Sequence, residues 1–141
     1  ITSCEIAETT KVIYYDAFLG CGDITSITIP DGVVSIGTSA FNNRNTSSSL
    51  TTIKFSNSLT SIGDFAFRGC RLSAVVIPSS VTSIGIYVFD ECRNLTTITC
   101  NSASVGTNTI GLSMYFTPTG GTKSDEPTNT WKTGTGVYTS T

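Results

Sequence analysis

The residues best suited to chemistry in this sequence are its five cysteines, because the chain contains no histidine. Without histidine, neither a Cys-His pair nor a Ser-His-Asp triad can activate a nucleophile. Zinc also loses its commonest ligand, and the sequence has no Cys-x-x-Cys pair that could begin a metal site. We therefore expect no catalytic residue, no cofactor and no metal site.

Two acidic pairs, Asp90-Glu91 and Asp125-Glu126, are the other candidates for chemistry. Paired acid-base catalysis requires two carboxyl groups that face one site, whereas the side chains of sequence neighbours diverge. The remaining acidic residues are scattered and mostly accompany turns, where solvation is the simple explanation and calcium binding the alternative. We expect the protein not to be an enzyme.

Composition argues against two classes of partner. Charged residues make up 13% of the 141 residues and the net charge is -2, so no basic field exists to hold a nucleic acid. No run of about 18 apolar residues occurs, which argues against membrane insertion. The chain opens with Ile1 rather than Met, so we expect a processed product or a piece of a longer protein.

The elements that would position any site come from an internal repeat. Nearly the same thirteen residues occupy 29–41, 55–67 and 77–89. The repeat reads L-x-x-I-x-I-x-x-x-V-x-x-I-G-x-x-A-F-x-x-C. The alternation in I-x-I is typical of a strand, and the glycine indicates a bend. The i, i+3 spacing in A-F-x-x-C favours one helical or 3₁₀ turn. The units begin at Ile1, Ile24, Leu50, Leu72 and Leu95.

One such unit cannot fold alone, since burial of its apolar positions does not offset the ordering of about 22 residues. Stacking of units buries their open faces and pairs their strands. Fixed spacing is what stacking requires, because a slip of one residue would turn the apolar positions outward. The sequence therefore predicts a solenoid of about five coils of 22–26 residues with a parallel sheet along one side. The anchor residues of the repeat should form one stack: Phe18, Phe41, Phe67 and Phe89.

The stretches LTTIKFSNSLTSIGDFAFRGC and LSAVVIPSSVTSIGIYVFDEC resemble the Treponema-type, or BspA-like, leucine-rich repeat. The resemblance covers roughly residues 1–100 and depends on the Ile-Gly, Ala-Phe and Cys positions. It implies an α/β fold, namely a right-handed leucine-rich-repeat solenoid with a concave parallel sheet. It also implies a bacterial or protist surface protein that adheres to host or neighbour-cell molecules, with an extracellular or cell-surface location.

The repeat weakens after residue 100. We interpret residues 1–100 as the solenoid, 101–116 as a degenerate last coil or cap, and 117–141 as a Thr/Gly-rich C-terminal tail or linker. An alternative for the last segment is a cap that docks through its larger apolar side chains, Trp131, Val137 and Tyr138.

Three cysteines share one position of the repeat, and we expect Cys21, Cys70 and Cys92 to point into the core as small apolar side chains. Equivalent positions of neighbouring coils lie about 5 Å apart, so a Cys70–Cys92 disulfide remains an alternative. Cys4 and Cys100 lie four coils apart and cannot form a bridge within one chain.

Outward strand positions form the first candidate interaction surface, because solenoids bind partners on such faces. These side chains are small and mostly neutral, and they lack the Trp, Tyr and Arg that anchor tight interfaces. The alternative is that these outward residues only keep the surface of the sheet soluble. The candidate residues are Thr28, Lys54, Val76, Thr99, Thr52 and Thr97.

An inserted loop at 42–49, with the sequence NNRNTSSS, forms the second candidate surface. Its candidate residues are Asn43, Arg44 and Asn45, and Arg44 replaces the cysteine of the repeat. A tolerated surface insertion is the alternative. Asn45 and Asn94 each begin an N-glycosylation sequon, which matters only for a eukaryotic source.

These observations predict a non-catalytic protein- or glycan-binding scaffold of a cell-surface or secreted, adhesin-like protein. Its partner would be a host or neighbour-cell protein or glycan. The alternative is a structural subunit that self-associates end to end through the strand edges of the solenoid. Ice binding by threonine rows is a weaker third possibility, since Lys54 and Val76 interrupt the rows.

Overall fold

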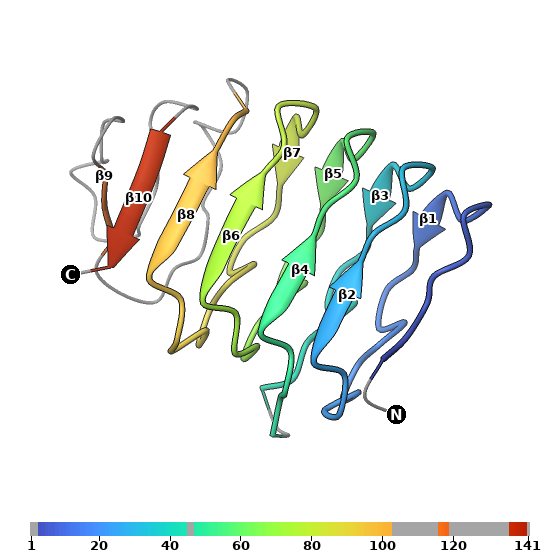
Figure 1. The fold of residues 1–141 in the computed structure, drawn as a ribbon, viewed down its shortest axis with the longest axis horizontal. Coiled ribbons are helices and arrows are strands. Elements are labelled where there is room, and N and C mark those ends of the chain that lie inside the picture. The colour runs from blue at the N-terminus through green and yellow to red at the C-terminus, as the bar shows by residue number, and fades with distance from the viewer. Residues whose placement is uncertain (1–2, 45–46, 103–115, 119–135, 141) are drawn as a thin grey trace.

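The computed structural model describes residues 3–44, 47–102, 116–118 and 136–140. The described residues contain no helix, and hence none that could cross a membrane. Ten strands alternate with turns (Figure 1). The strands are β1 (Val12–Ile13), β2 (Ser26–Thr28), β3 (Ser35–Ile36), β4 (Thr52–Lys54), β5 (Ser61–Ile62), β6 (Ala74–Ile77), β7 (Ser83–Ile84), β8 (Thr97–Cys100), β9 (Phe116–Pro118) and β10 (Gly136–Ser140).

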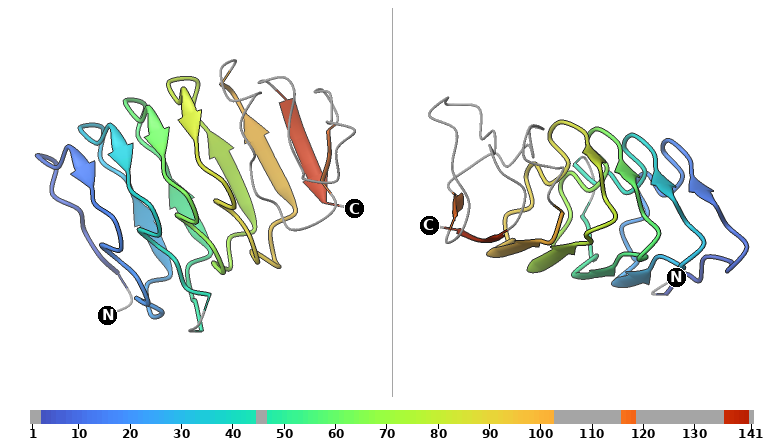
Figure 2. Two further views of the ribbon diagram at one scale, coloured as in Figure 1. Left: turned by 180° about the vertical axis from the view of Figure 1, so that it is seen from behind. Right: turned by 90° about the horizontal axis from the view of Figure 1, so that it is seen from above.

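The chain winds as a parallel-strand solenoid of about four turns. Strands β2, β4, β6 and β8 follow one side of the coils, and β1, β3, β5 and β7 follow the other (Figures 1 and 2). Equivalent repeat positions pair in register, as Ile36 does with Ile62 and Ile62 with Ile84. We number the coils 1 to 4 from the units that begin at Ile1, Ile24, Leu50 and Leu72. The strand β8 opens a further unit, and the expected total of five coils is not confirmed.

The predicted aromatic stack is confirmed and forms the centre of the core. The rings of Phe18 and Phe41 lie 4.8 Å apart between centroids, those of Phe41 and Phe67 5.1 Å, and those of Phe67 and Phe89 5.8 Å. The angles between neighbouring ring planes are 4°, 7° and 15°. Each coil therefore places its phenylalanine on that of the coil before it, and Phe67 is completely buried.

The glycine of the repeat is required by close contact between coils. A Cβ atom on Gly63 would lie 2.5 Å from the backbone nitrogen of Thr38, and one on Gly37 would lie 2.6 Å from that of Tyr15. Coil 1 has Tyr14 at this position, and its side chain is exposed. No earlier coil lies against Tyr14 among the described residues, so its side chain meets no backbone there.

The expected helical or 3₁₀ turn is wrong. Ala40 N donates to the carbonyl of Gly37, closing a turn in which Ser39 has a φ of 56°. A positive φ at the third position is what a type II turn requires. Ser39 N donates to Asp64 O and Phe41 N to Ala66 O, both at 2.8 Å. These amides donate to carbonyl groups of the next coil, so they cannot form the hydrogen bonds of a helix. The same position has φ values of 54–56° in every coil, at Asp16, Ser39, Phe65 and Tyr87.

The sheet edge at β8 is covered by C-terminal residues. Strand β10 runs antiparallel to β8, with Val137 opposite Thr99 and Tyr138 opposite Ile98. Strand β9 in turn pairs with β10. Part of the segment predicted as a tail therefore adds two strands to the sheet. Trp131, residues 103–115 of the last coil or cap expected at 101–116, and the rest of the predicted tail lie outside the described residues.

All five cysteines are free thiols, including Cys70 and Cys92. Cys70 Sγ donates to the carbonyl of Phe41 at 3.2 Å, and Cys92 Sγ donates to that of Phe67 at 3.1 Å. Each thiol therefore donates a hydrogen bond to a carbonyl group of the preceding coil. The prediction that Cys21 points into the core is wrong, because Cys21 is exposed. The reason is its place in coil 1, where the described residues include no earlier coil to accept its hydrogen bond.

Candidate binding surfaces

The outward residues of β2, β4, β6 and β8, here called the sheet surface, lie where the sequence predicts them. Thr28, Lys54 and Val76 are exposed, and Val76 keeps 54% of its surface in contact with solvent. Thr52 is also exposed, while the outward residues of β8, next to β10, are half-buried. Those residues are Thr97 and Thr99.

On the sheet surface, β2 pairs in register with β4, and β6 pairs in register with β8, whereas β4 and β6 belong to separate sheets. Thr28 lies opposite Lys54, and Val76 lies opposite Thr99. Lys54 carries the only charge of these four side chains. The surface therefore offers hydroxyl groups and small apolar groups but no aromatic ring or guanidinium, which anchor most tight interfaces. A role for it in binding stays a prediction.

The inserted loop does not present all its predicted residues to solvent. Asn43 is only 4% exposed, and its Nδ2 donates to the carbonyl of Phe41 at 3.0 Å and lies 4.0 Å from Cys70 Sγ. Asn43 therefore points inward, beside the cysteine of coil 3. Arg44 turns outward as predicted, and Asn45 lies outside the described residues.

Arg44 belongs to a charge network that the sequence does not reveal. Its Nε lies 3.0 Å from Oε1 of Glu91, and Nη2 of Arg68 donates to the same oxygen at 3.0 Å. Nε of Arg68 lies 2.8 Å from Oδ2 of Asp90. Arg68 and Asp90 are largely buried, with side chains 18% and 8% exposed, whereas Arg44 is 51% exposed. The network therefore links coils 2, 3 and 4, with its inner half shielded from water.

The backbone of Arg44, in coil 2, lies directly against Gly69 of coil 3. Gly69 has a φ of 74°, and a Cβ there would lie 2.8 Å from Cα of Arg44. Coil 4 has Glu91 at the equivalent position, with a φ of 57°. A left-handed conformation costs a residue with a Cβ roughly 1–2 kcal/mol. Glu91 holds that conformation while its carboxylate pairs with two arginines.

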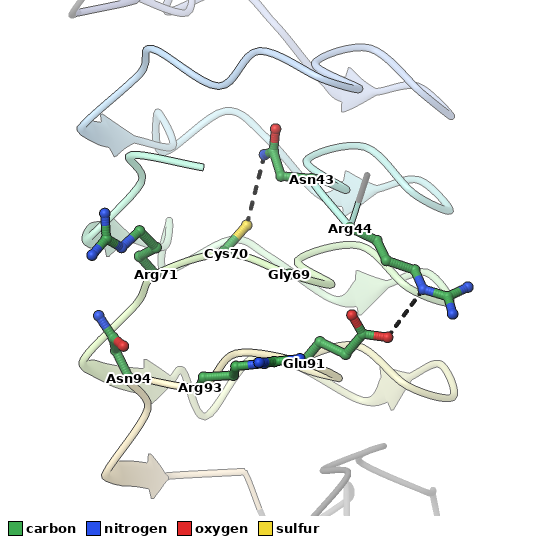
Figure 3. Close-up of a pocket in the computed structure, with 8 residues that line it drawn as sticks. All are labelled: Asn43, Arg44, Gly69, Cys70, Arg71, Glu91, Arg93 and Asn94. Atoms are coloured by element: carbon green, nitrogen blue, oxygen red, sulfur yellow. Dashed lines mark hydrogen bonds and ion pairs between the residues drawn. The ribbon is translucent and has the colours of Figure 1, made fainter. Parts of the chain in front are cut away.

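The network forms one wall of a hollow of about 250 Å³, here called the arginine hollow (Figure 3). Arg44 and Arg71 project at opposite ends of it, and Arg93 and Asn94 lie along one side (Figure 3). Arg68 is paired with the Glu91 carboxylate, so all four arginines of the chain either line the hollow or contact a residue that lines it. The lining residues are Asn43, Arg44, Gly69, Cys70, Arg71, Glu91, Arg93 and Asn94.

Two aromatic side chains lie next to this network, and we call them the aromatic ledge. The rings of Phe65 and Tyr87 stack with centroids 5.5 Å apart and an angle of 10° between planes. The guanidinium of Arg68 lies 5.3 Å from the centre of the Phe65 ring. Both aromatic residues have a positive φ, which is unusual for bulky side chains. Tyr87 is nevertheless 46% exposed.

The described residues hold no group of three cysteine or acidic side chains placed to bind one metal ion. The calcium alternative at the acidic turns therefore gains no support from them. Asp64, at one such turn, accepts a hydrogen bond from Ile86 N at 2.9 Å, which gives it a role in holding the turn. Burial raises the pKa of Cys70 to about 12, opposed by the hydrogen bond from Asn43. This thiol is thus a poor nucleophile at neutral pH.

The sequence predicted Asn43 and Arg44 as candidate residues of this face, but not the arginines of the neighbouring coils. A signal was present, since Arg68, Arg71 and Arg93 all follow the anchor phenylalanine of their coil by one to four residues. The repeat alignment treats these positions as variable, which hides their shared location. Whether these arginines lie close together depends on the conformation of the turn after each anchor phenylalanine. The sequence had predicted a helical conformation for that turn.

Short parallel strands, stacked anchor residues and a repeat of 22–26 residues define a leucine-rich-repeat solenoid. The family model for the BspA type leucine rich repeat region (6 copies) matches residues 11–123. The chain therefore belongs to the BspA-type leucine-rich repeat family. No curated protein matches the chain.

Two solved structures are similar to this chain. One is a leucine rich cell surface protein from Faecalibacterium prausnitzii A2-165, with a TM-score of 0.60, 36% identity and 69% of this chain covered. The other is a leucine-rich repeat protein from Bacteroides capillosus ATCC 29799, with a TM-score of 0.54, 36% identity and 62% of this chain covered. The similar part spans 24% of the first protein and 61% of the second.

Proposed function

We propose that this chain is a binding module of a cell-surface or secreted protein, and that it holds a host or neighbour-cell protein or glycan. Leucine-rich repeat proteins are generally binding scaffolds, and stacked coils supply a rigid one. The relative from Faecalibacterium prausnitzii is described as a cell surface protein, which supports the same location for this chain.

The observation that carries the proposal is the shared location of the four arginines and the aromatic ledge. Tyrosine and arginine are enriched among the residues that dominate interface energies. Phe65 and Tyr87 also hold strained backbone conformations, and such strain tends to be kept at functional sites. We therefore assign binding to this turn face, formed by the arginine hollow and the aromatic ledge, in preference to the sheet surface.

The test is an array of glycans and extracellular-matrix proteins probed with the purified chain and four variants. Tyr87→Asn and Arg44→Gln alter the turn face, and asparagine tolerates the left-handed conformation at position 87. Lys54→Gln and Val76→Thr are matched changes on the sheet surface. We expect the turn-face variants to lose the signal that the other two keep. The opposite pattern would transfer binding to the sheet surface.

We do not extend the proposal to end-to-end assembly. A second copy that stacked on coil 1 in the register of the solenoid would bring its backbone against Cβ of Tyr14, where the other coils have glycine. The edge at β8 is already paired with β10. Size-exclusion chromatography over a concentration series should give a constant elution volume, whereas filaments in electron micrographs would restore the assembly hypothesis.

A further inference from the structure

We propose that the arginine hollow binds the acidic group, a carboxylate or a sulfate, of a saccharide. This inference depends on the proposed binding function and names a ligand class for one part of the turn face. The hollow would hold the acidic sugar unit, while the aromatic ledge remains available for other contacts of the same partner.

The charges of the hollow are unbalanced in favour of an anion. Its lining contains three arginines and one glutamate, a net charge of +2 in a chain of net charge -2. Glu91 pairs with Arg44, at one end of the hollow. Within residues 3–44 and 47–102, no carboxylate lies within 4.0 Å of the guanidinium of Arg71 or Arg93. Two of the three arginines that line the hollow thus have no acidic partner in the described coils.

The chemistry of arginine suits this ligand. A guanidinium presents a planar fork of donors that matches a carboxylate or sulfate with two parallel hydrogen bonds. Arg71 and Arg93 come from coils 3 and 4, which are held in register by the backbone bond from Gly69 N to Asp90 O at 2.8 Å. The two side chains therefore extend from a rigid base, which lowers the entropy lost when they close on an anion.

The remaining groups favour a sugar over an acidic peptide. The Asn94 amide, which lines the hollow, can both donate and accept hydrogen bonds. A saccharide carries hydroxyl groups that satisfy such groups, whereas an aspartate or glutamate side chain carries none. The volume of about 250 Å³ also lies near the lower limit of small-molecule sites, about 300 Å³, and an extended peptide would overhang it.

The experiment compares three trisaccharide- or disaccharide-sized probes on the full chain: 3′-sialyllactose, lactose 3′-sulfate and lactose. Affinities are measured by calorimetry or NMR titration for the native chain and for Arg71→Gln, Arg93→Gln and Lys54→Gln. Arg71 and Arg93 are exposed, so circular dichroism should show that both variants fold. Lys54→Gln removes one positive charge from the sheet surface and controls for net charge.

We expect at least one acidic probe to bind about tenfold or more tightly than lactose, and each arginine variant to lose about tenfold or more of that affinity. Lys54→Gln should change the affinity by less than about twofold. Binding of only the sialylated or only the sulfated probe supports the inference and identifies the acidic group. Equal affinity for lactose, or no effect of the arginine variants, overturns it.

The outcome separates this inference from the broader function. If a protein on the array binds through Tyr87 and Arg44 but neither acidic probe binds, the binding module stands and the saccharide site is wrong. A hexaglutamate peptide serves as the last comparison. Should it bind with the same dependence on Arg71 and Arg93 while both sugars fail, the hollow recognises acidic protein and the saccharide inference is overturned.

Discussion

Oε1 of Glu91 lies 3.0 Å from Nε of Arg44, although the two residues belong to coils separated by a third. The contact passes over Gly69, where a side chain would collide with the backbone of Arg44. Arg68, from the intervening coil, donates to the same oxygen. One carboxylate therefore joins three consecutive coils and shapes the wall of the arginine hollow.

The two arginines of this network should differ sharply in their effect on stability. Arg44→Ala should lower the free energy of unfolding by at most about 1 kcal/mol, because its ion pair is half exposed to solvent. Arg68→Ala should cost about 3–5 kcal/mol, because it leaves Asp90 buried without its cation. Urea unfolding of both variants measures the difference, and similar losses would contradict the assigned burial.

Phe67→Ala should destabilise the protein by about 3–5 kcal/mol, since it opens a cavity in the middle of the aromatic stack. Phe18→Ala provides the control, because Phe18 stacks on one ring among the described residues and is only partly buried. Its loss should be clearly smaller. Thermal or urea unfolding monitored by circular dichroism gives both values, and equal losses would show that the stack is not the centre of the core.

Gly63→Ala should lower stability by about 1–3 kcal/mol, because its Cβ would lie 2.5 Å from the backbone of Thr38, which has no room to yield. Tyr14→Ala changes the same repeat position in coil 1, where the side chain is exposed. It should alter stability by less than about 0.5 kcal/mol. A mild Gly63→Ala variant in the same unfolding assay would mean that the coils are spaced more widely than the structure has them.

Stability should fall at alkaline pH because thiols that are buried or partly buried resist ionisation in the folded protein. Burial raises the pKa of Cys70 to about 12, and it also raises the pKa of Cys92. Both stay protonated in the folded protein when the unfolded chain begins to ionise near pH 8.5. The folded state then binds more protons, so the free energy of unfolding decreases as pH rises from about 9 towards 12.

The slope should approach about 1.4 kcal/mol per pH unit for each thiol that is fully protonated when folded and ionised when unfolded. Urea unfolding between pH 7 and 11 measures it, and Cys70→Ala serves as the control that flattens the dependence. A maleimide reagent at pH 7 supplies a second check. It should label exposed Cys21 quickly and leave buried Cys70 unlabelled, and rapid labelling of Cys70 would contradict its burial.

The repeat alone was enough to predict the stacked coils, because each apolar position must meet its counterpart in the next coil. The phenylalanine stack and the outward direction of Thr28 and Lys54 follow from this rule. The form of the A-F-x-x-C turn did not follow from it. Its i, i+3 spacing suits a helix, but the amides of Ser39 and Phe41 donate to the next coil, and only the assembled solenoid provides those carbonyls.

Of the residues that line the arginine hollow, Asn43 and Arg44 were predicted from the sequence as interaction residues. Arg44 drew attention because it interrupts the cysteine position, and the structure places it outward. Arg71 and Arg93 could not be assigned to the same face from their spacing, since the direction of a side chain in consecutive turns depends on φ values that the sequence does not specify. Asn43 was expected outside and lies inside, because its amide donates to the carbonyl of Phe41 in its own coil.

By itself, the sequence determined the class of fold, the membership of the core and the exclusion of histidine-dependent chemistry, because periodic burial and residue type are local properties. The tertiary structure decided which charges meet. Arg44, Arg68 and Glu91 are separated by more than twenty residues from one to the next and converge only when three coils stack. Contacts of that kind depend on the distance between coils and on the left-handed turns, and both arise from packing of the whole chain.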